Sequence, residues 1–132
     1  MKLQIPSILP LLPALVSLLK TEMIKADCKP GNGLILNFRD PNYSAETGGF
    51  HPVEIALNAD GHLLYITDFA YVGDGYFAEL CKELDFDFSV GVFQHMGREY
   101  PLQVGAELFA IWQQNFCEYV SWGVFKTSHS VL

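Results

Sequence analysis

The sequence is poor in positive charge. Lysine and arginine together number 8 of 132 residues, against 15 aspartates and glutamates, so the formal net charge is −7. The two arginines are Arg39 and Arg98, and the lysines are scattered without a basic run. Proteins that bind nucleic acid need clustered positive charge to displace counterions from the phosphates. The sequence therefore predicts that nucleic acid is not a partner.

Cysteine is scarce as well. Cys28, Cys81 and Cys117 are an odd number, and no two of them have the Cys-x-x-Cys spacing. This pattern supports neither a disulfide framework nor a zinc site, and three reduced thiols are typical of the cytoplasm. No cluster of histidine, cysteine and acidic residues has the spacing of metal ligands along the chain. We therefore expect no metal and no other cofactor.

The sequence also lacks a hydrophobic run long enough to cross a bilayer. The leucine-rich stretch at 8–19 is shorter than a membrane span and is interrupted by Pro10 and Pro13. It faintly resembles a signal peptide. However, no small-x-small cleavage site follows it, and the apolar spacing continues through Met23 and Ile24 as in an amphipathic helix. We expect a packed first helix in a cytoplasmic protein that does not bind membranes.

Apolar and aromatic residues are abundant. Half of the chain is hydrophobic and 14% is aromatic, which argues against disorder, and 132 residues correspond to a single domain, 1–132. Periodicity and turn residues predict helices near 12–25 and 105–123 and strands near 34–38, 51–58, 62–72, 84–94, 98–104 and 124–130. Residues 76–83 fit either a helical turn or a strand. The order predicts an α+β fold, with an antiparallel sheet of about five or six strands and an N-terminal and a C-terminal helix packed on it.

Two of these segments allow finer predictions. The strand at 62–72 is apolar on both faces, which predicts a central strand that is covered on both sides. The helix at 105–123 carries one broad apolar stripe with Trp112 at its centre. The stripe consists of Leu108, Ile111, Trp112, Phe116 and Tyr119.

Four strings of the sequence are distinctive. They read NFRDPNYSAETGGFHPVEI, YITDFAYVG, ELDFDFSVGVFQ and WQQNFCEYVSWGVF, and they fall in this order along the chain. Together they resemble a family of small bacterial proteins that is classified as a domain of unknown function. The resemblance covers about residues 34–130 and implies an uncharacterised bacterial protein. It implies no activity, substrate or catalytic residue.

The segment at 40–50 is a long connection between two apolar runs. Its Asn, Ser, Thr and Gly pair are what a tight loop needs for local hydrogen bonds and positive φ, so turn chemistry explains most of its composition. Long structured loops on a rigid sheet also tend to carry binding sites. Ser44 lacks the context of a nucleophile, and the glycine pair lacks the lysine or helix start of a phosphate loop.

Asp68 is the most unusual polar residue, because it interrupts an apolar strand face and so needs partners. Arg39 immediately precedes the 40–50 loop. We predict that it pairs with Glu54 or Asp68 and fixes the loop over one end of the sheet. A ligand pocket should then open beside the loop, lined by Tyr43, His51 and Tyr65. The candidate ligand-binding residues are Arg39, Tyr43, His51, Glu54, Tyr65 and Asp68.

Two other polar pairs are weaker candidates. His51 and Glu54 have the His-x-x-Glu spacing, but a strand points them to opposite faces, so they should not share a metal ion. Asp85 and Asp87 share one strand face, and we interpret them as part of a solvated surface.

Two functions remain open from the sequence. The first is a non-enzymatic binding or protein-interaction module, which would use the 40–50 loop and an aromatic sheet face containing Tyr65, Phe69, Tyr71 and Phe93. Its partner would be another protein, a second copy or a ligand. The alternative is a small-molecule enzyme with a site around Arg39, Asp68 and the loop. No catalytic residue can be named.

Overall fold

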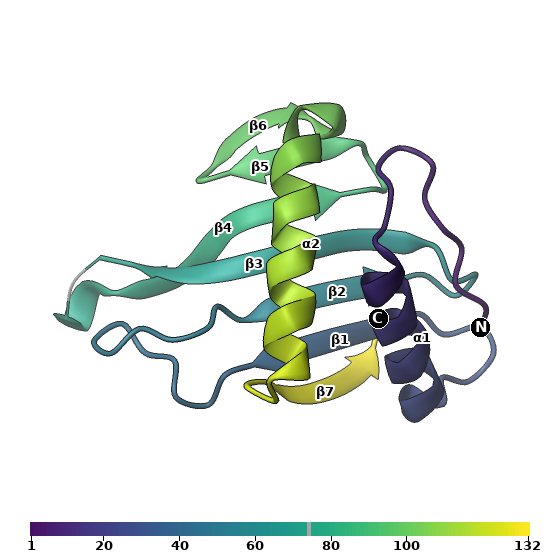
Figure 1. Ribbon diagram of the computed structural model, residues 1–132, viewed down its shortest axis with the longest axis horizontal. Coiled ribbons are helices and arrows are strands. Elements are labelled where there is room, and N and C mark those ends of the chain that lie inside the picture. The colour runs from purple at the N-terminus through teal and green to yellow at the C-terminus, as the bar shows by residue number, and fades with distance from the viewer. Residues whose placement is uncertain (74) are drawn as a thin grey trace.

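The computed structural model describes residues 1–73 and 75–132. One antiparallel sheet has the strand order β6-β5-β4-β3-β2-β1-β7, and two helices pack on it (Figure 1). The elements are α1 (Pro13–Ala26), β1 (Leu34–Arg39), β2 (Val53–Leu57), β3 (Leu63–Val72), η1 (Gly75–Phe77), β4 (Glu79–Asp87), β5 (Val92–His95), β6 (Arg98–Pro101), η2 (Leu102–Gly105), α2 (Ala106–Ser121) and β7 (Lys126–Val131). The fold is α+β, as expected, with seven strands instead of five or six.

The additional strand arises where one strand was predicted at 84–94. The chain turns after β4, so that this segment belongs to two strands, β4 and β5. Asp87 Oδ1 accepts hydrogen bonds from the backbone N–H groups of Ser89 and Val90, and Gly91 has a positive φ of 71°. This local turn chemistry overrides the alternation of apolar residues, which continues through the turn. The ambiguous residues before it form the short η1 helix and the beginning of β4.

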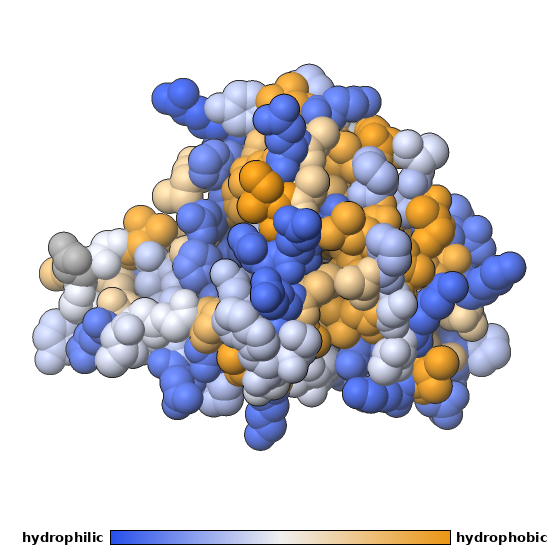
Figure 2. Space-filling view, viewed as in Figure 1, coloured by the Kyte–Doolittle hydropathy of each residue, from blue (hydrophilic) through white to orange (hydrophobic). Residues whose placement is uncertain are grey.

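Both helices lie on the same face of the sheet (Figure 1). The prediction that the strand at 62–72 is covered on both sides was therefore only half right. β3 is the central strand, fourth of seven, but no helix among the described residues covers its other face. We call this second face the open face. Seen from the helix side, hydrophilic residues dominate the outward surface of α2, and hydrophobic ones appear between α2 and α1 (Figure 2).

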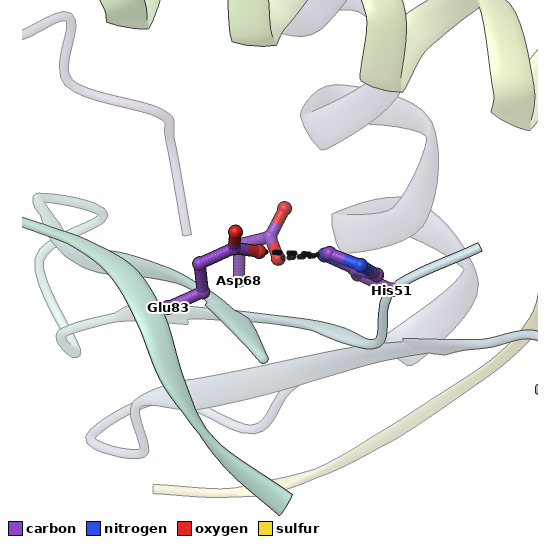
Figure 3. Close-up of side chains that lie close together, drawn as sticks. All are labelled: His51, Asp68 and Glu83. Atoms are coloured by element: carbon purple, nitrogen blue, oxygen red, sulfur yellow. Dashed lines mark hydrogen bonds and ion pairs between the residues drawn. The ribbon is translucent and has the colours of Figure 1, made fainter. Parts of the chain in front are cut away.

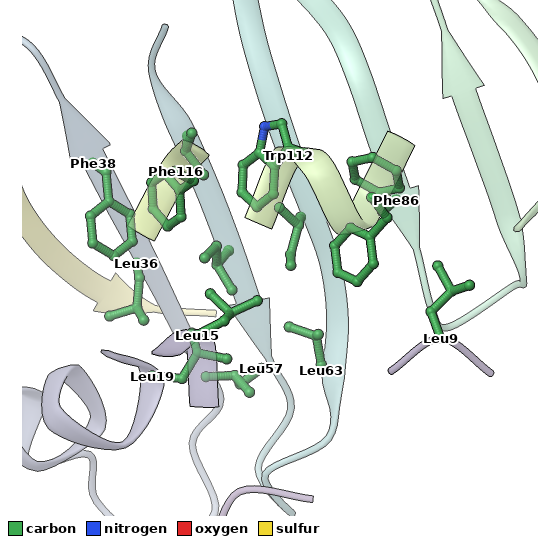
Figure 4. Packing of buried hydrophobic residues seen from close by; sticks show 14 of the residues in the cluster. Leu9, Leu15, Leu19, Leu36, Phe38, Leu57, Leu63, Phe86, Trp112 and Phe116 are labelled. Atoms are coloured by element: carbon green, nitrogen blue, oxygen red, sulfur yellow. The ribbon is translucent and has the colours of Figure 1, made fainter. Parts of the chain in front are cut away.

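The hydrophobic core lies between the helices and the sheet (Figure 4). Alternate residues of the strands point into it, among them Leu36, Ile55 and Phe86, and α1 contributes Leu15 and Leu19, all of them fully buried. This packing follows from the two periodicities, because every second strand residue and every third or fourth helix residue share a face.

α2 is rotated slightly from the predicted stripe. Trp112 and Phe116 are buried as expected, but Ile111 is 56% exposed, and Phe109 and Gln113 are each 1% exposed. The sequence pattern missed Gln113 because it is polar. Its amide accepts a hydrogen bond from the backbone N–H of Leu12 and donates one to the carbonyl of Pro10, which ties the segment before α1 to α2.

The two helices have the character of packed, amphipathic elements. Over the described part of the chain, neither they nor the short η helices combine the length and hydrophobicity that a membrane span requires.

Candidate functional site

Three side chains that could ligate a metal ion converge where β2 begins (Figure 3). His51 lies two residues before β2, Asp68 is on β3, and Glu83 is on β4. His51 Nδ1 lies 2.9 Å from Asp68 Oδ1 and 2.9 Å from Glu83 Oε2. The three ligand atoms all lie within 4.8 Å of one another. Adjacent strands thus bring together residues that are far apart in the sequence.

Strand register places His51 beside Asp68. Val53 and Asp68 are cross-strand partners, and the backbone N–H of Phe69 donates to the carbonyl of Pro52 at 2.9 Å. His51, which precedes Pro52, is therefore held beside Asp68 at the start of β2. Both His51 and Asp68 were candidates from the sequence, but nothing in the sequence indicated that they bond to each other.

Glu83 reaches the site because of an irregularity in β4. Asp68 lies opposite Leu84 and Phe69 lies opposite Lys82, so Glu83 is an extra residue without a partner on β3. Such a bulge redirects a side chain that regular alternation would send to the other face. Since Leu84 points into the core, regular alternation would have pointed Glu83 to the open face. Glu83 was not among the candidates predicted from the sequence, where the only signal for it was the irregular pattern of residues 76–83.

Asp68 is buried and has two partners. Its Oδ1 bonds to His51, and its Oδ2 accepts a hydrogen bond of 2.9 Å from Trp112 Nε1. The prediction that Asp68 needs partners is confirmed, but the prediction that Arg39 is one of them is wrong. Arg39 is exposed, lies opposite Lys126 on the edge strand β7, and has no ion pair with any residue in 1–73 or 75–132. Neighbouring Phe38 is buried, so strand alternation turns Arg39 to the open face, away from Asp68.

Asp40, not Arg39, organises the 40–50 loop. One oxygen of its buried carboxylate accepts from the backbone N–H of Asn42, and the other accepts from that of Phe50. A carboxylate can bridge the two ends of a loop in this way because it offers two acceptors. Gly49 has a φ of 137°, and a Cβ there would lie 2.8 Å from Asp40 Oδ2, so this position requires glycine. Turn chemistry thus accounts for the loop, as the sequence indicated.

A cavity of about 320 Å³ opens beside the loop, between the loop and α2. Phe, Tyr and Trp make up five of its ten lining residues, and His51 and Asp68 are also on its wall. The lining residues are Gly49, Phe50, His51, Val53, Asp68, Trp112, Asn115, Phe116, Tyr119 and Phe125. A pocket was expected at this place. Of its three predicted lining residues, His51 is present, Tyr43 packs against His51 from outside with ring centroids 5.5 Å apart, and Tyr65 is on the open face.

The surroundings of His51 favour its charged form. The hydrogen bond to Asp68 raises the pKa of His51, burial opposes this in part, and the negative charges of Asp68 and Glu83 raise the pKa further. The side chain of His51 is 37% exposed, so solvent reaches the imidazole. With both carboxylates near Nδ1, the ring nitrogen left for other contacts is Nε2.

The other candidates lie apart from this cluster. The hydroxyl of Tyr65 donates to Glu54 Oε2 on the open face, whereas His51 bonds to Asp68 on the helix side, so Glu54 and His51 lie on opposite faces of the sheet, as predicted. Burial, the hydrogen bond to Glu54 and nearby acids raise the pKa of Tyr65. The interpretation of Asp85 as a solvated acid was wrong. It is buried and accepts a hydrogen bond from Thr67, and burial raises its pKa.

The predicted aromatic sheet face does not include all four of its residues, because one of them lies on the other side of the sheet. Phe93 is on the helix side, where it stacks on Phe86 at 5.3 Å and lies against Gly105. Tyr71 packs on Tyr43 at 5.2 Å. Tyr65 is occupied by its bond to Glu54. Phe93 is separated from the three aromatic residues of β3 because the turn between β4 and β5 changes which residues share a face.

Comparison with known proteins agrees with the resemblance in the sequence. The family described as "Protein of unknown function (DUF2787)" matches residues 13–130. The chain belongs to this family. The match includes His51, Asp68 and Glu83, so the cluster lies within the DUF2787 domain. No curated protein matches this DUF2787 chain.

Two solved structures of bacterial proteins are similar to this DUF2787 chain. One is a hypothetical protein from the Vibrio cholerae VSP-II pathogenicity island, with 37% identity, a TM-score of 0.83, and coverage of 98% of this chain and 99% of that one. The other is a conserved hypothetical protein from the Vibrio cholerae island VPI-2, with 39% identity, a TM-score of 0.81, and coverage of 95% and 98%. The second is described as sharing structural homology with the human P32 protein.

Proposed function

We propose that the protein is a non-enzymatic binding module whose ligand site is the cavity beside the 40–50 loop. The observation that carries this proposal is the combination of aromatic walls with one polar end, formed by His51 and Asp68. Binding sites for small molecules are concave and mostly apolar, with a few placed polar groups. A volume of about 320 Å³ suits a small ligand.

The chemistry of the walls defines the class of ligand. Phe50 and Tyr119 contact each other with ring centroids 4.7 Å apart, and Phe116 and Phe125 do so at 5.6 Å. A flat apolar ring can pack against such faces. Nε2 of a protonated His51 can donate a hydrogen bond, and Asn115 adds an amide. A neutral aromatic molecule with an acceptor oxygen satisfies both the walls and the polar end.

Charge argues against an anionic ligand. A protonated His51 carries one positive charge, whereas Asp68 and Glu83 together carry two negative ones, so the cluster repels anions overall. The protein is also acidic as a whole, with a formal net charge of −7. We therefore expect aromatic ketones or amides to bind in preference to aromatic carboxylates of the same shape.

The enzyme alternative has less support. Arg39, one of its three proposed parts, is exposed on the open face and away from the cavity. Within residues 1–73 and 75–132, those that line the cavity include no serine, cysteine, threonine or lysine that could act as a nucleophile. What favours the alternative is the bond between His51 and Asp68, since an acid that orients a histidine is a common arrangement for general base catalysis.

Tryptophan fluorescence tests the proposed site directly. The chain has two tryptophans, and Trp122 is 60% exposed, so the variant W122F leaves Trp112 on the cavity wall as the sole reporter. We expect acetophenone and benzamide to change Trp112 emission saturably, and benzoate to do so weakly. The variant N115A should weaken the response, and R39A should not. The absence of saturable binding by any of these probes would contradict the proposal.

A further inference from the structure

We infer that His51, Asp68 and Glu83 form a binding site for one divalent transition-metal ion, at the edge of the cavity. The three side chains come from three adjacent strands and their ligand atoms converge on one point (Figure 3). This site was not expected, because the prediction of no metal rested on the spacing of ligand residues along the chain, and the three residues meet only through strand pairing. The proposal goes beyond ligand binding in the cavity and does not depend on it.

The distances fit a metal centre better than they fit a hydrogen-bonded histidine. Nδ1 of His51 can donate only one proton, yet two carboxylate oxygens approach it at 2.9 Å each. Adjacent nitrogen and oxygen ligands of a tetrahedral zinc ion, with bonds of about 2.0–2.1 Å, are separated by about 3.3 Å. Each carboxylate oxygen thus lies close to the distance from the imidazole nitrogen that neighbouring ligands of one ion have, and the three ligand atoms all lie within 4.8 Å of one another.

The structure around the three residues also holds them in place. The extra residue in β4 turns Glu83 towards His51, a placement that a regular strand would not give. Trp112 donates a hydrogen bond to the second oxygen of Asp68 and so fixes the orientation of the first. Hydrogen bonds to a ligand from its neighbours are a regular feature of metal sites. Tyr43 packs against the ring of His51 and limits its rotation.

An ion can also reach this point. The side chains of His51 and Glu83 are 37% and 33% exposed, whereas that of Asp68 is 12% exposed. Ligands on one side and solvent on the other would leave coordination positions free for water or for an oxygen of a cavity ligand. One imidazole and two carboxylates suit zinc, manganese or iron(II) better than magnesium or calcium.

Metal binding requires a proton to leave. The ion takes the place of the proton on His51 Nδ1, and the nitrogen lone pair then forms the bond to the metal, so one proton passes to the buffer when His51 is protonated. Calorimetry in two buffers of different ionisation enthalpy measures this release. A structural ion pair without a metal site would give no such signal.

The decisive experiment is titration of the untagged, chelator-treated protein with Zn²⁺ and separately with Mn²⁺. We expect one ion per chain, tighter binding of Zn²⁺ than of Mn²⁺, and no heat with Mg²⁺. The variants E83Q and H51Q should each weaken binding at least about tenfold. Glu83 is partly exposed, so E83Q should remain folded, which far-UV circular dichroism checks.

Three matched controls complete the test. E54Q changes an acid on the opposite face of the sheet, H129Q changes an exposed histidine on β7, and C81S removes a thiol close to Glu83 in sequence. All three should bind as the wild type does. Lack of binding by the wild type, or binding that E83Q and H51Q leave unchanged, overturns the metal site. The cavity titrations are done in chelator, so that failure of one proposal is distinguishable from failure of the other.

Discussion

Trp112 Nε1 donates a hydrogen bond to Asp68 Oδ2 across 2.9 Å, and this bond joins α2 to the central strand of the sheet. Both groups are buried, with 8% of Trp112 and 9% of Asp68 exposed. A buried carboxylate is costly unless it is hydrogen-bonded, so the indole and His51 together allow Asp68 to exist in the core. The packing of α2 and the geometry of the candidate site therefore depend on the same residue.

Removal of the indole should destabilise the protein in two separable steps. W112F keeps an aromatic ring but leaves Asp68 Oδ2 without its donor, which should cost about 1–3 kcal/mol. W112A also opens a cavity and should cost about 3–5 kcal/mol in total. Urea denaturation measures both values. W122F, at an exposed position, is the control and should change the midpoint little. Equal midpoints for W112F and the wild type would mean that the bond contributes nothing.

The contribution of His51 to stability should depend on pH. Its pKa in the folded state is raised, chiefly by the hydrogen bond to Asp68, above the unfolded value of 6.5. Folding therefore favours the protonated form, and this stabilisation is fully present below the unfolded pKa and is lost as the pH rises through the folded pKa. The groups that face His51 are Asp68, Glu83 and Tyr43.

Denaturation of the wild type and H51Q at about pH 5.5 and about pH 9 tests this dependence. The stability of the wild type should exceed that of H51Q by more at the lower pH. A nuclear magnetic resonance titration should place the pKa of His51 above 6.5. A measured pKa below that value would refute the assigned charge state.

Adjacent residues at the start of the 40–50 loop should behave differently. D40A removes the acceptor of the Asn42 and Phe50 N–H groups, so we expect a loss of about 1–3 kcal/mol and faster proteolysis within the loop. R39A changes an exposed side chain where β1 pairs with the edge strand β7, and it should alter the free energy of unfolding by less than about 1 kcal/mol. Limited proteolysis with mass mapping compares D40A with R39A. A larger effect of R39A than of D40A would mean that Arg39, not Asp40, holds the 40–50 loop.

Asp85 should be dispensable or unfavourable as a charge. Burial raises its pKa in the folded state, although the bond from Thr67 and the nearby Lys82 lower it in part. An acid with a raised folded pKa binds its proton more tightly when folded, so its effect on stability becomes less favourable as the pH rises through this range. D85N keeps an acceptor for Thr67 Oγ1 and should be as stable as the wild type at neutral pH, or more stable. Chemical denaturation at several pH values measures the difference, which should shrink in acid, and a clear destabilisation by D85N at neutral pH would contradict it.

Local patterns predicted the elements well, and long-range partners poorly. The helix at Pro13–Ala26 and the long central strand at Leu63–Val72 were expected within about one residue at each end, because hydrophobic spacing and turn residues define them locally. The turn after Asp87 was missed because its aspartate and serine fitted an alternating strand equally well.

The partners of the residues in the candidate site were even harder to predict from local sequence patterns. His51 and Asp68 were both chosen from the sequence, since one begins a strand and the other interrupts an apolar face. Their bond depends on the register of two strands, and Glu83 joins them through one unpaired residue in β4. Neither register nor a bulge can be read reliably from one sequence when both strand faces carry apolar residues. Arg39 was assigned the wrong role for the same reason, since its face was fixed only by the pairing of β1.

The pairing of β1 with β7 also constrains when the protein can finish folding during its synthesis. Each of β1 to β5 pairs with the next strand along the chain, whereas the last strand, β7, pairs with β1, where Leu34 lies opposite Val131 and Arg39 opposite Lys126. The outer edge of β1 therefore remains exposed to other chains until residues 126–131 have left the ribosome. The same delay applies to Asp68, whose donor Trp112 is made more than forty residues later. Nascent chains that stall after β6 should hence bind chaperones or aggregate. Once β7 has left the ribosome, it can pair with β1 and cover this edge.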